Sequence, residues 1–233
     1  MLKDSQNLPE RVRAVRERIA AAASRCGRNA ASVTLLAVSK SQPAAAVRET
    51  AAAGVADVGE SYVDEALGKL ASLDDLPLTW HFIGRLQANK TRPVAERFDW
   101  VHSLDRLRIA ERLSAQRPFH APPLNVCLQV NLAAEPAKGG VAPEQLPALA
   151  AAVAALPRLA LRGLMCIPPR AEASACQRRW FARLRELRDL LNASGARLDT
   201  LSMGMSEDFE SAILEGATVV RIGTALFGAR PAA

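Results

Sequence analysis

The sequence predicts a (β/α)8 barrel, and three observations predict it. Short apolar or β-branched runs alternate with helical patterns, which is typical of parallel strands joined by crossover helices. Eight such runs fit within 233 residues, the usual size and count for this barrel. Polar and glycine-containing clusters follow the runs, where barrels of this class carry their functional groups. We expect one α/β domain over residues 1–233, with a site at the carboxyl ends of its strands.

Each expected element has its own signal. An additional N-terminal helix is predicted first, because apolar residues recur at alternating spacings of three and four from Val12 to Cys26, and Gly27 follows. The expected strands are Val33–Ser39, Val55–Val58, Thr79–Ile83, Trp100–His102, Leu124–Val130, Leu159–Ile167, Leu198–Ser202 and Thr218–Ile222. Expected helices include Pro43–Ala53, Tyr62–Leu73, Arg106–Gln116, Pro143–Leu156, Ala173–Ala193 and Glu207–Leu214.

Composition excludes several classes of protein. With 49% apolar and 23% charged residues, the chain is neither disordered nor fibrous, and its net charge of +6 is spread along the sequence. The four cysteines contain no CxxC pair, so neither a zinc site nor a disulfide framework is expected. The charged N-terminus lacks the apolar core of a signal peptide, and the apolar run Leu146–Leu156 is too short to span a bilayer. We expect a soluble, cytoplasmic protein.

Lys40 is the first candidate functional residue. It ends the run TLLAVSK, where the first strand should deliver a side chain into the mouth of the barrel. A partly desolvated lysine has a lowered pKa, and its free amine can attack a carbonyl to form a Schiff base. The alternative is a strand-end lysine in solvent. The other lysines are expected on the surface: Lys3, Lys69, Lys90 and Lys138.

Two turns near the C-terminus are typical of an anion site. LSMGMSEDF (201–209) places a small turn before an acidic first helical turn, and VVRIGTALFG (219–228) runs into Gly223-Thr224. The loops after the seventh and eighth strands often bind phosphate in such barrels. Glycines after strands also serve simply as turn residues, but together with Lys40 these turns suggest an aldehyde that carries a phosphate.

Motifs along nearly the whole chain resemble a known family, the YggS/PROSC-type pyridoxal phosphate homeostasis proteins. The family has the fold of the N-terminal barrel domain of alanine racemase. The resemblance is carried by these segments: AVSK (37–40), GESYVDEA (59–66), WHFIGRLQANK (80–90), VHSLD (101–105), VNLAAEPAKGG (130–140), GLMCIPP (163–169) and LSMGMSEDFESAILEGATVVRIGTALFG (201–228).

The resemblance implies a cofactor and the residues around it. Lys40 would hold pyridoxal 5'-phosphate as an internal aldimine, and Arg221 would face the pyridine nitrogen. Met165 and His81 would line the ring pocket, although His81 could equally be a histidine packed beside Trp80. The implied phosphate-binding residues are Ser202, Met203, Gly204, Gly223 and Thr224.

Two positions depart from the family's pattern. Ser61 stands where the family's GEN motif has asparagine, and Arg85 where IGHLQ has histidine. A serine hydroxyl can still donate to the phenolate oxygen of the cofactor, but it is shorter than asparagine. Arg85 is expected on the rim. Three more residues match a family motif without a role that we can derive: Asn131, Glu135 and Lys138.

The function that this resemblance implies is homeostasis of pyridoxal phosphate by a protein without turnover of its own. The partners would be the cofactor and apo-enzymes that accept it, with no membrane, in a monomer or weak dimer. The alternative is an amino-acid racemase, which needs acid and base groups on both faces of the substrate. The chain ends without the second domain that brings a tyrosine in alanine racemase, and its one tyrosine, Tyr62, begins a helix. The histidines remain open as bases: His81, His102 and His120.

A cation against the ring nitrogen also weakens the cofactor as an electron sink, which favours the binding protein over the racemase. A further alternative is a nucleic-acid surface on the arginine-rich segment Cys176–Leu191. Its apolar residues repeat at helical spacing, so we expect its arginines to form the solvated face of a barrel helix, and we expect no nucleic-acid partner.

Overall fold

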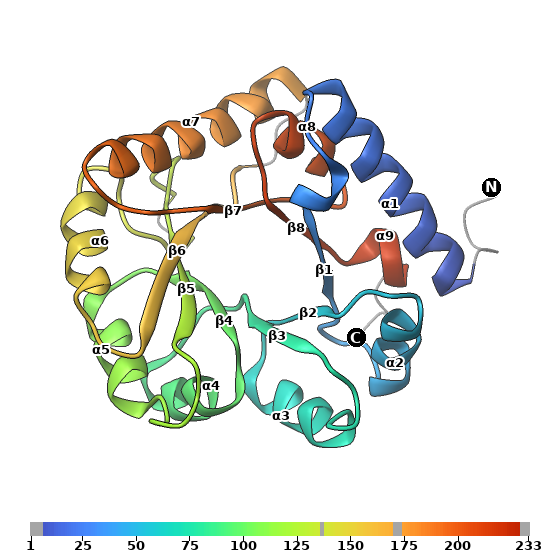
Figure 1. Ribbon diagram of the computed structural model, residues 1–233, viewed down its shortest axis with the longest axis horizontal. Helices are drawn as coiled ribbons and strands as arrows, with labels where there is room; N and C mark the ends of the chain where they lie inside the picture. The colour runs from blue at the N-terminus through green and yellow to red at the C-terminus, as the bar shows by residue number, and fades with distance from the viewer. Residues whose placement is uncertain (1–6, 136–137, 170–173, 229–233) are drawn as a thin grey trace.

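Eight parallel strands form the barrel in the computed structural model, which describes residues 7–135, 138–169 and 174–228. In sequence order they are β1 (Thr34–Val38), β2 (Asp57–Glu60), β3 (Thr79–Phe82), β4 (Trp100–Leu104), β5 (Leu124–Gln129), β6 (Leu159–Met165), β7 (Thr200–Met205) and β8 (Val219–Ile222). Each strand pairs with the next, and β1 pairs with β8, with Leu36 opposite Arg221. Figure 1 shows the ring of strands enclosed by helices. The predicted (β/α)8 barrel is confirmed.

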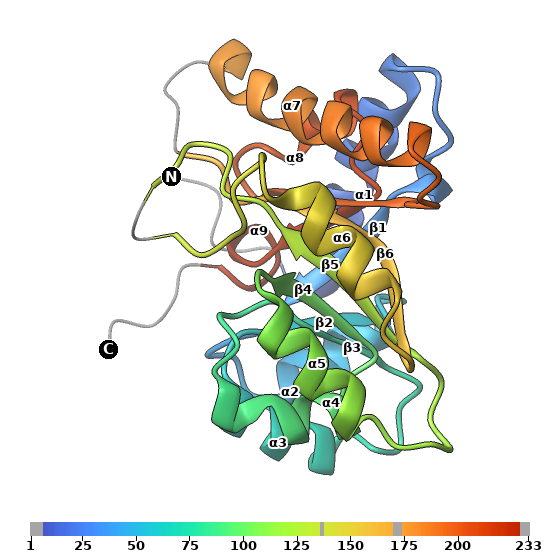
Figure 2. The ribbon, with the colours of Figure 1, turned by 90° about the vertical axis from the view of Figure 1, so that its left-hand side faces the viewer.

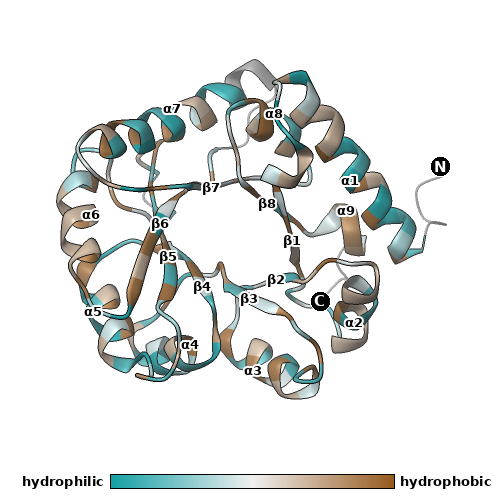
Figure 3. Cartoon of the chain, in the orientation of Figure 1, coloured by the Kyte–Doolittle hydropathy of each residue, from teal (hydrophilic) through white to brown (hydrophobic). Residues whose placement is uncertain are grey.

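The helices form the outer layer of the barrel (Figure 1). After α1 (Leu8–Arg25) they are α2 (Ala44–Ala52), α3 (Val63–Ser72), α4 (Thr91–Arg97), α5 (Leu107–Gln116), α6 (Leu146–Ala154), α7 (Ser174–Ala193), α8 (Phe209–Leu214) and α9 (Thr224–Phe227). Both hydrophilic and hydrophobic residues occur on them, as expected for helices with one face on a barrel and the other in solvent (Figure 3). Among the described helices, not one is both long and apolar enough to cross a membrane.

The additional N-terminal helix α1 begins where the sequence signals a helix start. The Asn7 side chain accepts from the backbone N–H of Glu10, and the Glu10 carboxylate accepts from the backbone N–H of Asn7, a reciprocal capping box. Its buried residues lie on one stripe: Val12, Val15, Ile19, Ala22 and Ala23. This stripe packs the helix against α8, α9 and α2, beside the seam between the first and last strands.

Side chains that alternate in direction along each strand form two separate cores, one between the strands and the helices and one inside the barrel. In β7, Leu201 and Met203 join the apolar cluster between the strands and the helices, whereas Ser202 bonds to side chains from β4 and β8 across the barrel interior. In β1, Leu35 and Ala37 likewise join the outer cluster. Because side chains alternate in direction along a strand, the intervening residues face the interior.

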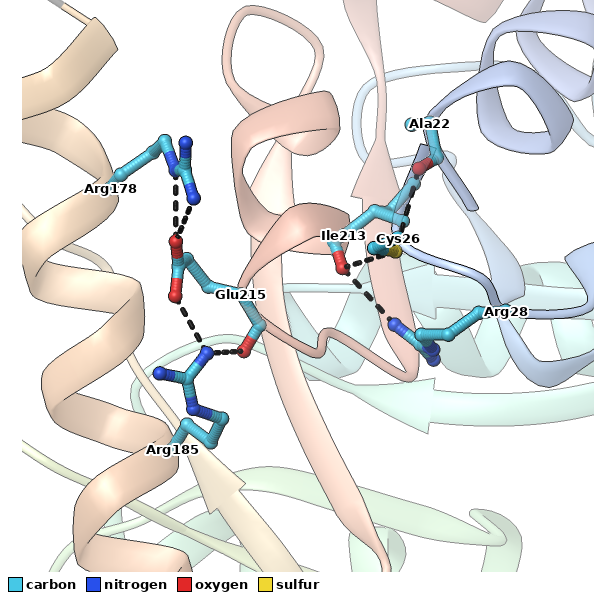
Figure 4. Close-up of polar contacts among 7 residues, drawn as sticks. All are labelled: Ala22, Cys26, Arg28, Arg178, Arg185, Ile213 and Glu215. Atoms are coloured by element: carbon cyan, nitrogen blue, oxygen red, sulfur yellow. Dashed lines mark hydrogen bonds and ion pairs between the residues drawn. The ribbon is translucent and has the colours of Figure 1, made fainter. Parts of the chain in front are cut away.

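The short helix α8 is tied to the helices on both sides of it (Figure 4). On one side, the Glu215 carboxylate accepts from Arg178 Nε at 2.8 Å and from Arg185 Nη1 at 2.6 Å, both on α7. On the other side, the Ile213 carbonyl accepts from Arg28 Nη1 at 3.2 Å and from Cys26 Sγ at 3.8 Å. These contacts satisfy the carboxyl end of α8 and fix the helix behind the turn that precedes it.

Candidate functional site

A cavity of about 440 Å³ opens at the carboxyl ends of the strands. Five of the sequence-predicted residues line it together: Lys40, Ser61, Arg221, Gly223 and Thr224. The turn 205–208 after β7 and Gln177 of α7 complete the side that faces α8. The volume is that of a small-molecule site, and the lining combines apolar walls with a few converging polar groups.

Lys40 lies two residues beyond β1, and a buried cluster holds the backbone on both sides of it. We call Ser39, Glu60, Glu65 and Lys69 the lysine cluster. Lys69 Nζ donates to the Ser39 carbonyl at 2.7 Å, to Glu60 Oε1 at 2.7 Å and to Glu65 Oε1 at 2.6 Å. Glu65 Oε1 also accepts from the backbone N–H of Ser41. The cluster therefore fixes both chain neighbours of Lys40.

Ser41 shows why such support is needed. Its φ of +62° lies in the left-handed region, which disfavours residues with a Cβ. Strained backbone of this kind persists where the surroundings over-determine it, and it gathers at functional sites. Here the carboxylate of Glu65 and the amine of Lys69 supply that constraint. The result is a fixed backbone on both sides of Lys40, which lines the cavity.

Glu60 is a fully buried acidic member of the lysine cluster. Its side chain is fully enclosed, and Oε2 has no hydrogen-bond partner among the described residues. Burial raises the pKa of the Glu60 carboxyl, while the bonds from Lys69 and Ser39 oppose that rise. A charge in this position depends on Lys69 for its compensation.

The expected surface position of Lys69 is wrong. Its side chain is only 7% exposed, because α3 carries it over the end of β2 onto Glu60. The predictions for Lys90 and Lys138 fit better, since both side chains are about a third exposed. Lys3 lies outside the described residues.

Arg221 brings a buried cation to the floor of the cavity. It is 5% exposed, and it donates from Nη1 to Ser202 Oγ and from Nη2 to the Cys166 carbonyl, both at 2.9 Å. Both acceptors are neutral. Burial lowers the pKa of the guanidinium, and Asp208 partly opposes that effect. These two bonds therefore do not neutralise the positive charge of Arg221. The guanidinium suits a ligand atom that is rich in electrons.

The turn after β7 lies later than the sequence predicts. The strand continues to Met205, with an irregular register against β8 between Ser202 and Met205, so the cavity is lined by residues 205–208. Asp208 shapes this turn, because Oδ1 accepts from the Met205 N–H and Oδ2 from Gln177 Nε2. An acidic residue before the apolar run FESAIL is a helix-start signal that could have placed the turn.

The turns after β7 and β8 meet each other at the cavity. The Ala225 N–H donates to Ser206 Oγ at 3.2 Å, which joins the first turn of α9 to the turn 205–208. Gly223 and Thr224 line the same side of the cavity as Ser206. The pair of turns thus forms one wall that presents backbone and hydroxyl groups.

The other five predicted site residues do not line the cavity. Ser202, Met165 and His81 are buried in the barrel interior, and His81 stacks on Trp100 at 5.5 Å between ring centroids. Met203 belongs to the outer apolar core. Gly204 has φ +92°, and a Cβ there would come within 2.7 Å of Ala212 Cβ, so its visible role is the close approach of β7 to α8. Direct contact of these five with a ligand stays a prediction.

Ser61 and Arg85, which depart from the family's pattern, lie in different places. Ser61 lines the cavity, and a Cβ at Gly84 would lie 2.1 Å from the Ser61 carbonyl oxygen. Only glycine permits this contact between the loops after β2 and β3. Arg85 is exposed and does not belong to the described residues that line the cavity.

Asn131, Glu135 and Lys138 acquire a structural role. Asn131 Oδ1 accepts from the Glu135 N–H at 3.2 Å, and Asn131 Nδ2 donates to the Glu135 carbonyl at 3.0 Å. Lys138 Nζ pairs with Glu135 Oε1 at 2.9 Å. These bonds fold the loop after β5 back on itself. In the side view of Figure 2, this loop and α9 lie at the same end of the barrel.

The arginine-rich helix α7 follows the prediction for a barrel helix. Its apolar face is buried through Phe181, Leu184, Leu187 and Leu191. The arginines contact acids of the same chain: Arg178 and Arg185 with Glu215, Arg183 with Glu186, and Arg188 with Asp189. Their charge is thus largely used within the fold.

These features define a barrel that presents Lys40, a buried guanidinium and two joined turns to one cavity. The chain is similar to several known proteins. The family model described as "Alanine racemase, N-terminal domain" matches residues 11–231. A protein of Pseudomonas aeruginosa named "Pyridoxal phosphate homeostasis protein" is 64% identical, over 96% of each chain. Its namesake in Escherichia coli K12 is 52% identical, over 93% of this chain and 94% of that one.

Solved structures of two proteins have the same fold. PipY of Synechococcus elongatus, solved with PLP bound, superposes with a TM-score of 0.85 at 41% identity, over 95% of this chain and all of PipY. Alanine racemase of Corynebacterium glutamicum gives 0.69 at 18% identity, over 94% of this chain and 61% of the racemase, which shows the fold alone. The chain belongs to the family of pyridoxal phosphate homeostasis proteins, within the alanine racemase N-terminal-domain class.

Proposed function

We propose that this protein binds pyridoxal 5'-phosphate and takes part in its homeostasis, holding the cofactor on Lys40 without turning over a substrate. One observation carries the proposal: Lys40, Arg221 and the two joined turns all line the same cavity. The residues fit the cofactor, since its aldehyde, ring nitrogen and phosphate each require one of these groups. The PLP-bound structure of PipY and the names of the relatives support it.

Each part of the cavity has a proposed task. Lys40 Nζ condenses with the aldehyde carbon and releases water, so its amine must be neutral when it attacks. Ser206, Gly223 and Thr224 surround the phosphate through N–H and hydroxyl groups. Arg221 donates toward the ring nitrogen and keeps that nitrogen unprotonated. When bound, the cofactor supplies an electrophilic aldehyde and a conjugated ring.

The groups around the cavity favour a binding protein over a racemase. Within the described lining there is no histidine and no tyrosine. His81 and His102 are buried beneath it, and His120 lies in the loop before β5, at the opposite end of the barrel. Tyr62 is 58% exposed beside α3. A racemase would need a second acid or base next to the substrate carbon, and these positions do not supply one.

Lys40→Ala tests the covalent assignment. The variant should fold, bind the cofactor weakly, and lose both the visible imine band and the adduct that borohydride fixes on the wild type. Mass spectrometry of peptides locates the adduct. Lys90→Ala, which removes a partly exposed lysine paired with Asp64, is the matched control and should retain both signals. An undiminished adduct in Lys40→Ala would assign the bond to another lysine.

Exchange in deuterated water tests the absence of turnover. The protein loaded with cofactor is incubated with L-alanine or L-serine, and the α-proton is followed by NMR. We expect no exchange on the timescale of the incubation beyond that of free cofactor. Exchange at about 1 per second or faster that disappears in Lys40→Ala would make the protein an enzyme and overturn the proposal.

A further inference from the structure

A line of five polar side chains crosses the barrel interior beneath the cavity, and the proposed function leaves most of it unexplained. Arg221 Nη1 lies 2.9 Å from Ser202 Oγ, which lies 2.7 Å from His102 Nδ1. His102 Nε2 lies 2.9 Å from His81 Nδ1, and His81 Nε2 lies 3.0 Å from Asp57 Oδ1. We call this line the interior chain. Its members come from β8, β7, β4, β3 and β2.

The two ends of the interior chain face different surroundings. Arg221 lines the cavity at the carboxyl end of the barrel. Asp57 is the first residue of β2, at the amino end, where its side chain is 32% exposed. The three groups between them are nearly or fully buried. The chain therefore connects the cavity to the opposite solvent face without an intervening water.

When each group between the ends carries one proton, the chemistry of the ends sets the direction of every hydrogen bond between them. A guanidinium only donates, and an ionised carboxylate only accepts. Ser202 Oγ must then accept from Arg221 and donate its proton to His102 Nδ1. His102 donates from Nε2 to His81 Nδ1, and His81 donates from Nε2 to Asp57. With one proton on each intermediate group, all four bonds are made and both histidines are neutral Nε2–H tautomers.

The surroundings of His102 favour its neutral form. Burial, together with the nearby His81 and Arg221, holds the pKa of His102 well below its ordinary value. Trp100 of β4 stacks on His81. The guanidinium of Arg162, from β6, lies over the Trp100 ring at 5.3 Å from its centroid and pairs with Asp199. From β5, Cys127 is buried in the same interior and its pKa is raised to about 12, so it stays a neutral thiol.

We propose that Asp57, His81 and His102 are positioning residues that act through Ser202 to hold Arg221 in register with the ring nitrogen of the bound cofactor. The interior chain fixes Ser202 as an acceptor toward Arg221, because its only proton is engaged by His102. This keeps one guanidinium nitrogen anchored and leaves the remaining N–H groups for the ligand and for Cys166. The ligand part of the inference rests on the proposed function; the direction of the chain does not.

Asp57→Asn is the informative change, because it lies at the far end from the cavity. A side-chain amide can accept or donate, so it no longer forces His81 to carry its proton on Nε2. The chain can then reverse: His81 donates from Nδ1 to His102, and His102 from Nδ1 to Ser202. Ser202 Oγ would accept twice and its own proton would lack an acceptor. Loss of the orienting carboxylate is known to select the wrong histidine tautomer in catalytic triads.

The first experiment reads the imidazoles of the ligand-free protein. The sequence has three histidines, so ¹⁵N NMR can assign each ring, and exposed His120 serves as the internal comparison. At pH 7, His81 and His102 should both be neutral Nε2–H tautomers. An imidazolium or an Nδ1–H tautomer at either residue in the wild type would overturn the inference. This readout needs no variant and no cofactor.

The second experiment measures pyridoxal phosphate affinity and the visible spectrum in Asp57→Asn. The control is Asp75→Asn, which removes an exposed carboxylate paired with Arg48. Asp57→Asn should weaken binding about 2- to 30-fold and shift the absorption band, whereas the control should match the wild type. Asp57→Glu, which retains an acceptor, should recover part of the loss. Unchanged affinity and spectrum in Asp57→Asn would overturn the positioning role.

The two proposals fail in distinguishable ways. If the wild type does not bind the cofactor, the proposed function is wrong, while the imidazole spectra still decide the direction of the interior chain. If the wild type binds but Asp57→Asn behaves like Asp75→Asn, the proposed function stands and the positioning role is wrong.

Discussion

Two buried sets of polar side chains, the lysine cluster and the interior chain, support the cavity from different sides and through different interactions. The lysine cluster is charged: Lys69 compensates Glu60 and Glu65, and the three bonds of its amine fix the backbone around Lys40. The interior chain runs from Arg221 to Asp57, and hydrogen bonds between buried side chains join its two ends. The comparison teaches that the chain neighbours of Lys40 are fixed through backbone contacts, whereas Arg221 is fixed through its side chain.

The largest expected effect comes from breaking the charged group. Lys69→Met removes the amine and leaves Glu60 buried without its cation, which should lower the free energy of unfolding by about 3–5 kcal/mol. Urea denaturation measures the change. Lys90→Met, at a partly exposed pair with Asp64, should cost no more than about 1 kcal/mol. Equal losses in the two variants would show that the lysine cluster carries no special weight.

A smaller loss is expected when the neutral part of the interior chain is broken. Ser202→Ala leaves Arg221 Nη1 and His102 Nδ1 without the hydroxyl that joins them, at a cost of about 1–3 kcal/mol for unsatisfied buried groups. Thermal or urea unfolding of the ligand-free protein measures it. Ser194→Ala, on an exposed serine, is the control and should stay within about 0.5 kcal/mol. An unchanged free energy of unfolding in Ser202→Ala would mean that the hydrogen bonds of the interior chain are not maintained in the folded protein.

The smallest expected effect is a pH dependence of the free energy of unfolding that comes from Glu60 in the lysine cluster. Burial raises the folded-state pKa of Glu60 above its ordinary 4.5, so the folded state binds this proton more tightly than the unfolded state. The contribution of Glu60 to the free energy of unfolding therefore falls as pH rises from the ordinary value through the raised one. In Glu60→Gln that contribution is absent. The free energy of unfolding of the variant minus that of the wild type, measured by urea denaturation, should rise with pH over this window and then level off. A difference that does not change between pH 4 and 8 would contradict this expectation.

The fold could be predicted because its signal is local and repeated. Alternation of apolar runs with helical patterns located all eight strands, and Lys40 followed from the end of the first run. The turn after β7 was placed too early, since the irregular register between Ser202 and Met205 lets the strand continue through a glycine-containing segment that looks like a turn.

The lysine cluster could not be predicted in the same way. A surface position is expected for Lys69 because lysine is rarely buried, although it lies among the buried residues of α3. Its burial depends on Glu60, which belongs to the preceding strand. Pairing between elements is tertiary information that periodicity does not contain. The same holds for His81, whose stacking partner Trp100 comes from the next strand and not from the neighbouring Trp80.

The pairing of β1 with β8 joins the first and last strands of the barrel, and the cavity straddles this seam. Lys40 follows one of these strands, while Gly223 and Thr224 follow the other, so these parts of the cavity wall meet only when the two ends of the sequence have come together. Such distant contacts form late because the chain must first lose the entropy of a long loop. A ligand that contacts both sides of the seam stabilises the pairing of β1 with β8. At a concentration one hundred times its Kd, it would add about 2.7 kcal/mol to the free energy of unfolding.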